Sequence, residues 1–69
     1  MAGHSESPLS GREIIVEFAE VGLAVKVSAM DTATLTEVCV QGPASAPRAV
    51  LERNALARLK YVLRKRGLL

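Results

Sequence analysis

The side chains that could carry out chemistry are few and lie far apart in the sequence. The chain of 69 residues has one cysteine, Cys39, and one histidine, His4. A single cysteine forms no internal disulfide, and no Cys/His cluster is present to hold zinc. His4 falls in a polar N-terminal segment, so Cys39 has no histidine to activate it. We expect no metal site, and a half-buried structural thiol at Cys39.

Three glutamates are the next candidates, because positioned carboxylates can act as general acid and base. Glu13, Glu17 and Glu37 are expected on one face of a sheet together with Lys26. Ordinary cross-strand ion pairing explains such a set better than catalysis does. The sequence also lacks a nucleophile elbow, a P-loop and a dinucleotide-binding fingerprint. We therefore expect no enzymatic activity, no catalytic residues and no cofactor.

The basic side chains are concentrated toward the C-terminus. Residues 1–46 carry two basic and six acidic side chains, a net −4, whereas residues 47–69 carry seven basic and one acidic, a net +6. The basic segment could contact nucleic-acid phosphates or an anionic membrane surface, or pair with the acidic half of a chain. One Phe and one Tyr are too few for a base-stacking platform, so charged flanks that solvate a helix are the simpler interpretation. The candidate basic surface consists of Arg53, Arg58, Lys60, Arg64, Lys65 and Arg66.

Period-two alternation of apolar residues predicts three strands, at about residues 12–20, 23–30 and 35–41. Residues 1–11 are polar and are expected to form a disordered tail. Turn residues separate the strands, so the sequence predicts a three-stranded antiparallel meander with residues 23–30 in the middle.

A turn centred on Val21 and Gly22 predicts the register of the first hairpin. It places Phe18 opposite Val25, Val16 opposite Val27, Ile14 opposite Ala29 and Glu17 opposite Lys26. A four-residue loop at 31–34 predicts the second hairpin, with Ala29 opposite Thr36, Val27 opposite Val38 and Val25 opposite Val40.

One amphipathic helix is predicted at about residues 47–66, after a hinge at residues 42–46. Ser45 or Ala46 is the expected cap, and Gly67 the expected terminator. Residues 12–66 therefore form one α+β domain of order β-β-β-α. Its candidate core and dimer contacts are Phe18, Val25, Val27, Val38, Val40, Leu51, Ala55, Leu59, Val62 and Leu63.

Two surfaces can be interpreted in two ways. The second sheet face mixes apolar and charged residues; we favour a solvated face over a second contact surface. Val50, Ala57 and Tyr61 form a weaker stripe on the far side of the helix, and either solvent or a second helix could cover it.

The length of the helix suggests a second copy of the chain. About twenty helical residues extend about 30 Å, whereas strands of about seven residues extend about 23 Å, so the end near Val62 and Leu63 would overhang. A chain this short also needs a stabilising device, and oligomerisation is the one that remains. We expect a homodimer, with each helix on its own sheet or exchanged onto the partner's sheet.

The expected location is the cytoplasm. A lone cysteine fits a reducing compartment, and the first residues lack the basic and apolar regions of a signal peptide. No apolar run approaches the roughly 20 residues that cross a bilayer, so no integral membrane association is expected.

Most of residues 18–66 resembles a family of small bacterial proteins of unknown function. The shared pattern comprises an AVKVSA strand at 24–29, a Thr-Glu-Val strand at 36–38, a Gly-Pro-Ala-Ser hinge at 42–45 and a Leu-Glu…Tyr-Val-Leu helix at 51–63. The resemblance implies a sheet followed by one helix and a homodimeric habit. It brings no activity, ligand or site residues.

The expected function is therefore a small non-enzymatic homodimeric module that binds a protein partner or acts as an adaptor. Nucleic-acid binding through the basic helix is the alternative.

Overall fold

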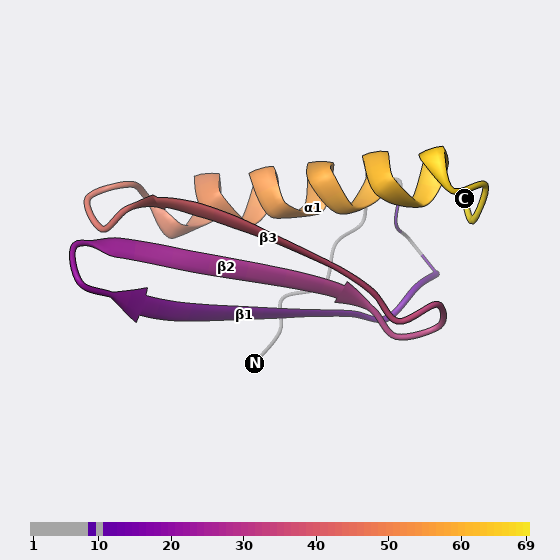
Figure 1. The fold of residues 1–69 in the computed structure, drawn as a ribbon, viewed down its shortest axis with the longest axis horizontal. Helices are drawn as coiled ribbons and strands as arrows, with labels where there is room; N and C mark the ends of the chain where they lie inside the picture. The colour runs from indigo at the N-terminus through magenta and orange to yellow at the C-terminus, as the bar shows by residue number, and fades with distance from the viewer. Residues whose placement is uncertain (1–8, 10) are drawn as a thin grey trace.

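Three antiparallel strands and one helix make up the fold (Figure 1). The computed structural model describes residues 9 and 11–69. The strands lie in the order β1-β2-β3, and the helix packs against one face of the sheet. This arrangement confirms the predicted α+β class and the β-β-β-α order. The elements are β1 (Ile14–Val21), β2 (Ala24–Asp31), β3 (Thr36–Pro43) and α1 (Arg48–Lys65).

Leu9 belongs to the packed part of the chain. Most of the predicted tail, residues 1–8 and 10, lies outside the described residues. Leu9 itself is 3% exposed and contributes to the core, and its carbonyl accepts a hydrogen bond from the Arg12 N–H at 3.1 Å. The prediction of a disordered tail was therefore wrong at Leu9, because the surrounding sequence is mostly polar and gave no sign that this one side chain is buried.

The first hairpin turns one residue later than predicted. Val21 pairs with Ala24, and Gly22 takes a φ of 61° at the first of the two turn positions, where a type II′ turn needs glycine. Phe18 therefore lies opposite Val27 instead of Val25. The predicted register was wrong by two residues, and an even shift keeps every side chain on its predicted face.

The second hairpin is displaced in the same way. Its four-residue loop covers residues 32–35, so Asp31 pairs with Thr36 and Ala29 lies opposite Val38 rather than Thr36. The loop closes with a hydrogen bond from the Leu35 N–H to the Asp31 carbonyl at 2.7 Å. Leu35 has a φ of 60°, an unusual conformation for a bulky residue. The loop lies one residue later than predicted, so the predicted register was again wrong by two residues.

The helix starts without a side-chain cap. Pro47 is the N-cap residue, not the predicted Ser45 or Ala46, and its carbonyl accepts bonds from the N–H groups of Val50 and Leu51. At the other end Gly67 takes a φ of 74°. The Leu68 N–H reaches the Leu63 carbonyl at 2.8 Å, and the Gly67 N–H bonds to the Arg64 carbonyl, which together form a Schellman motif.

The core lies between α1 and the inner sheet face, which is the face toward the helix. Seven of the ten predicted core residues are buried, and Phe18, Val40 and Val62 are partly buried against them. The buried apolar residues are Leu9, Val25, Val27, Ala29, Val38, Leu51, Ala55, Leu59 and Leu63.

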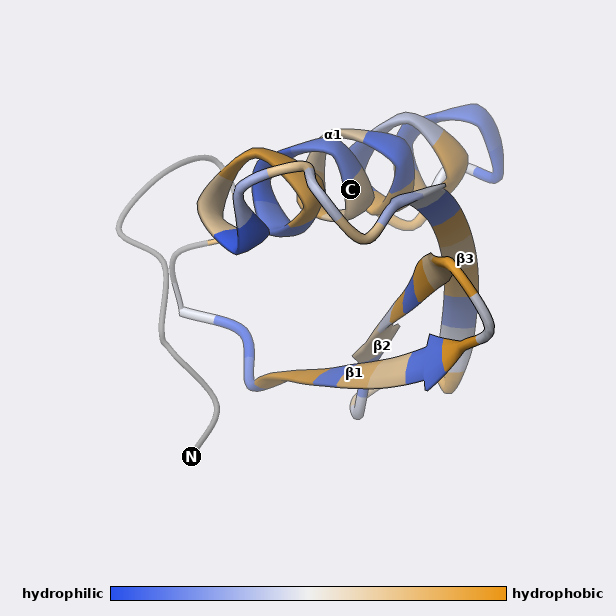
Figure 2. Ribbon diagram, turned by 90° about the vertical axis from the view of Figure 1, so that its left-hand side faces the viewer, coloured by the Kyte–Doolittle hydropathy of each residue, from blue (hydrophilic) through white to orange (hydrophobic). Residues whose placement is uncertain are grey.

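The helix covers β2 and β3 far better than β1. Its main contacts are with β3 and β2, and β1 lies farthest from it (Figure 2). Four residues of β2 are buried, whereas none of the eight residues of β1 is. One side of the sheet therefore lacks a complete second layer.

The predicted overhang of the helix is not observed. The helix has 18 residues and each strand has eight, so both elements extend to about 26–27 Å. Leu63, expected to project past the sheet, is completely buried. The length of the helix therefore gives no reason to expect a dimer, and the incompletely covered surface lies at β1.

Candidate functional site

The outer sheet face, which points away from the helix, does not assemble a catalytic cluster. Glu17 lies opposite Ser28 and not opposite Lys26, which pairs with Ala19 and Gln41. Cys39 is exposed, so the expectation of a half-buried thiol was wrong. Among residues 9 and 11–69, no three His, Cys, Asp or Glu side chains group as metal ligands. This face is a mixed polar surface that no described element covers.

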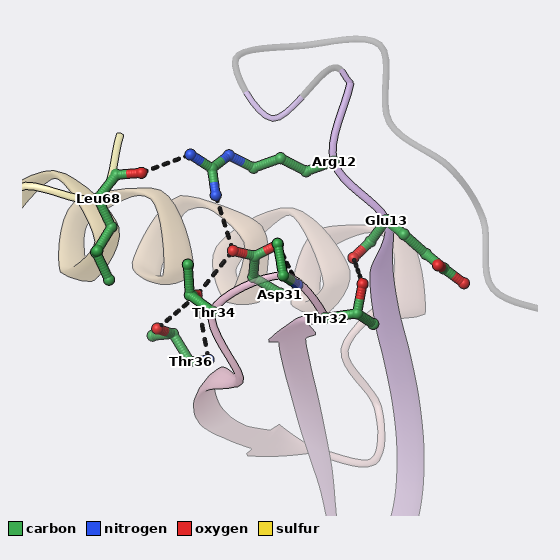
Figure 3. A network of polar contacts seen from close by, with 8 residues as sticks. Arg12, Glu13, Asp31, Thr32, Thr34, Thr36 and Leu68 are labelled. Atoms are coloured by element: carbon green, nitrogen blue, oxygen red, sulfur yellow. Dashed lines mark hydrogen bonds and ion pairs between the residues drawn. The ribbon is translucent and has the colours of Figure 1, made fainter.

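A buried carboxylate on the inner face was missed by the sequence analysis. Asp31 is fully buried at the end of β2, where Arg12 lies 2.8 Å from its Oδ2 atom (Figure 3). The Thr34 hydroxyl donates to the same oxygen at 2.8 Å, and the Ala33 N–H donates to Oδ1 at 3.4 Å. The signal was the strand alternation, because Asp31 continues the buried series of Val25, Val27 and Ala29. An acid at that position requires a partner.

The Asp31 network joins three parts of the chain. Arg12 precedes β1, Thr34 lies in the β2–β3 loop, and a second Arg12 nitrogen donates to the Leu68 carbonyl beyond α1. The hydroxyls of Thr34 and Thr36 lie 2.8 Å apart. Within the described part of the chain, no buried side-chain polar atom lacks a hydrogen-bond partner. The network is therefore satisfied internally and stabilises the fold.

The electrostatics of this network favour the ionised carboxylate. Burial alone would raise the pKa of Asp31, but the hydrogen bonds from Thr34 and Ala33 and the charge of Arg12 outweigh it. The pKa of the Asp31 carboxyl is lowered from its ordinary value of 3.8. Asp31 is thus held as a charged structural anchor, and the pKa of a general acid would have to be raised.

The candidate basic surface lies on the solvent side of α1. Arg53, Arg58, Arg64, Lys65 and Arg66 are exposed and Lys60 is half-buried. The ion pairs among the described residues are Arg12–Asp31 and Arg48–Glu20, and neither involves these six side chains. Within the described part of the chain, no ion pair therefore neutralises these charges.

Tyr61 lies within this basic surface and is 55% exposed. The charged groups of Arg58 and Lys65 lie 6.0 Å and 5.9 Å from its ring centroid. A π-system attracts cations at such distances. Two cations of the same helix therefore contact Tyr61, and no second helix among the described residues covers this stripe.

The acidic outer sheet face and the basic helix lie on opposite sides of the molecule (Figure 2). Mutual pairing of these two surfaces would join copies head to tail, without the closure that a two-fold axis gives. Asp31 belongs to the acidic half of the chain, but it is buried and paired with Arg12, so it offers no charge to the helix of a second copy.

The β1 side combines an uncovered apolar face with the edge of the sheet. Ile14, Val16 and Phe18 point inward and are only half-buried. Arg48 covers one end of this row, with its guanidinium carbon 5.0 Å from the Phe18 ring centroid and an ion pair to Glu20 at 3.3 Å. Past that end, Val21 at the end of β1 and Leu23 of the turn are exposed. The inner side of β1 is therefore less well covered than that of β2 or β3.

Fold and surfaces together define a small α+β domain, a three-stranded meander with one helix. Residues 11–66 match the sequence profile of a domain of unknown function, DUF6898, and the chain belongs to this family. No curated protein and no solved structure matched the chain. Among the described residues, no helix is long and apolar enough to span a membrane. This match confirms the expectation that the chain belongs to a family of unknown function.

Proposed function

We propose that this chain is a homodimeric, non-enzymatic module that acts by binding a partner. The observation that carries the proposal is the exposure of β1. This edge strand has eight residues, none of which is buried, and its inner apolar face is only partly covered. Open strand edges are sites where another chain can pair. Two copies would cover these surfaces mutually and would leave both helices free for a further partner.

The polar side chains support a binding role over a catalytic one. The buried carboxylate of Asp31 is fully hydrogen-bonded to its own chain, and its pKa is lowered. The exposed thiol of Cys39 lies opposite Ser28, in a strand rather than in a cluster of titratable groups. An exposed thiol suits a reducing compartment, and we include the cytoplasm in the proposal.

Sedimentation equilibrium between about 1 and 100 μM tests the dimer. We expect the mass of two chains over most of this range, with circular dichroism showing a folded protein. A folded monomer at every concentration would contradict the proposal. Capture of proteins by the tagged wild type, with a monomeric β1 variant as the control, would then identify partners that need the dimer.

Exchange of the helices between copies is the alternative form of the dimer. Within one chain the helix packs closely on β3, since a Cβ atom added to Gly42 would lie 2.5 Å from Leu51 Cδ2. The double variant Gly42→Cys/Leu51→Cys, made with Cys39→Ser, distinguishes the two forms. After oxidation, a denaturing gel shows single-chain mass if each helix stays on its own sheet, and double mass if the helices are exchanged.

Binding to nucleic acid is a second candidate function, favoured by the basic surface. Its six side chains form no ion pair with the described residues, and the acidic sheet face lies on the opposite side. Lysine and arginine on one helix face could contact successive phosphates. The alternative is that these charges only keep the helix soluble.

Fluorescence anisotropy with labelled DNA and RNA at two salt concentrations tests this second function. Binding at low salt that weakens steeply with added salt is expected if phosphates are contacted. Lys60→Gln/Arg64→Gln should weaken it and reduce its salt dependence. The control Glu17→Gln/Glu37→Gln changes charge on the opposite face and should not weaken it. No salt-sensitive binding at low salt would rule this function out.

A further inference from the structure

We infer that two copies pair antiparallel along β1, with the two-fold axis at Val16, so that their sheets join into one. The inference rests on the proposed homodimer and specifies its interface. It follows from three features of β1: the direction of its free backbone groups, the order of its inner-face side chains and the positions of its glutamates.

The backbone of β1 directs alternate residues toward β2. The Glu13 carbonyl accepts the Thr32 N–H at 3.1 Å, and Val21 and Ala24 close the two-residue turn. Odd-numbered residues of β1 therefore bond to β2, and even-numbered residues direct N–H and C=O groups outward. Those outward residues are Ile14, Val16 and Phe18, followed by Glu20. No described strand pairs with them.

Only one two-fold register pairs these three apolar residues with one another. With the axis at Val16, Val16 faces its own copy and Ile14 faces Phe18 of the second copy. An axis at Phe18 places Val16 opposite Glu20, and an axis at Glu17 places Ile14 opposite Glu20. The register at Val16 therefore gives the most apolar ladder on the inner face.

The glutamates of β1 favour the same register. An axis at Glu17 would set two carboxylates directly opposite each other, in the closer type of cross-strand pair. An axis one residue before Val16 would set Glu13 opposite Glu17. With the axis at Val16, Glu17 faces Ile15 of the second copy, and no carboxylate faces another directly. Glutamates remain diagonal neighbours on the solvent side, so added salt should tighten the dimer.

Joining the two sheets determines where the two helices lie. A two-fold axis perpendicular to the sheet leaves both copies of α1 on the same side. The inner-face residues of the two β1 strands then lie next to each other between the helices. The outer face keeps its charged side chains in water.

Disulfide crosslinking identifies the register without disturbing the core. Ile15, Glu17 and Ala19 are exposed on the outer face, so a cysteine at each leaves the packing intact. With the axis at Val16, residues 15 and 17 of different copies form a close pair with Cα atoms about 4.5 Å apart, a distance that suits a disulfide. All variants carry Cys39→Ser to remove the native thiol.

The expected result is a mixed disulfide when Ile15→Cys and Glu17→Cys chains are combined and oxidised. Rapid crosslinking of Glu17→Cys alone would indicate an axis at Glu17. Crosslinking of Glu17→Cys with Ala19→Cys would indicate an axis at Phe18. Either result, with a dimeric mass in sedimentation, would overturn the register and leave the homodimer intact. A monomeric mass would overturn both.

Val16→Pro tests the edge independently. The N–H that proline removes points away from β2, so the monomer loses no ladder bond. The dimer loses two bonds across its axis, and we expect its dissociation constant to rise at least about tenfold. Glu17→Pro is the matched control, because it removes a bond to β2 and should unfold the chain. A folded Val16→Pro that dimerises like wild type would overturn the inference; if that variant unfolds, the crosslinks decide.

Discussion

The two edge strands of this sheet have the same length and very different surroundings. β3 continues directly into the segment that leads to α1, which packs closely on it at Gly42 and Leu51. β1 has no comparable cover. A helix is about 10 Å wide, and three strands span about 14 Å, so one helix centred over β2 and β3 leaves the third strand underfilled. The comparison shows which edge of a one-helix domain remains open.

The backbones of the two edges differ as well. β3 ends at Pro43, and its odd-numbered residues point away from β2, so the N–H that proline lacks would have faced outward. The edge of β3 is thus blocked at one end. β1 contains no proline, and its charges are all glutamates. These differences make β1 the edge that can accept another strand.

The attachment of β1 can be broken at Arg12. Arg12→Ala removes the cation beside the buried Asp31 and the bond to the Leu68 carbonyl, and should lower the free energy of unfolding by about 2–3 kcal/mol. Urea denaturation measures this, with Arg12→Lys as the variant that keeps the charge. A loss well below about 1 kcal/mol would show that Thr34 and Ala33 alone hold the carboxylate.

Matched valine substitutions compare the inner faces of the two edges. Val38→Ala in β3 removes buried methyl groups and should cost about 2 kcal/mol, whereas Val16→Ala in half-buried β1 should cost about 1 kcal/mol or less. Urea denaturation at concentrations where the chain is monomeric gives both values. Equal losses would mean that β1 is covered as well as β3.

The pH dependence of the free energy of unfolding tests whether ionised Asp31 stabilises the fold. Its pKa is lowered in the folded chain, so its contribution is present above pH 3.8 and is lost as the pH falls toward the folded pKa. Asp31→Asn should be less stable than wild type by about 1–2 kcal/mol near neutral pH. The difference should narrow in acid. Denaturant unfolding of both proteins between about pH 7 and 2 measures it, and a constant difference would contradict it.

The smallest expected effect concerns the cover over Phe18. Arg48→Ala removes the cation over the ring and an exposed ion pair to Glu20, and should cost only about 0.5 kcal/mol. The change should also expose more of the β1 face and alter dimer affinity more than monomer stability. Arg53→Ala, on the solvent side of the helix, is the control. Equal effects of both substitutions on dimerisation would argue against a role for Arg48.

Alternation and helical periodicity were sufficient to predict the fold and most of its core. They predict that Val27 and Leu59 face inward, whatever the register. The registers were wrong because loop geometry determines them: a turn beginning at Gly22, and a loop in which Leu35 adopts a positive φ. Those details depend on backbone conformation at single residues.

The candidate surfaces were predicted less completely. The basic residues of the helix were found because their charge is visible in the sequence. The Arg12–Asp31 pair was missed because 19 positions separate the two residues, and only the strand pairing brings them together. The open side of β1 was missed because it depends on where the helix lies over the sheet.

The hydrogen bond from Arg12 to the Leu68 carbonyl holds the segment after α1 next to the segment before β1. The chain enters and leaves the domain at one end, opposite the Gly22–Leu23 turn (Figure 1). A short linker could therefore join the end of the helix to the start of β1, with new termini opened at that turn. A chain permuted in this way would carry its free ends beside the start of α1, with the order of elements changed and the sheet preserved.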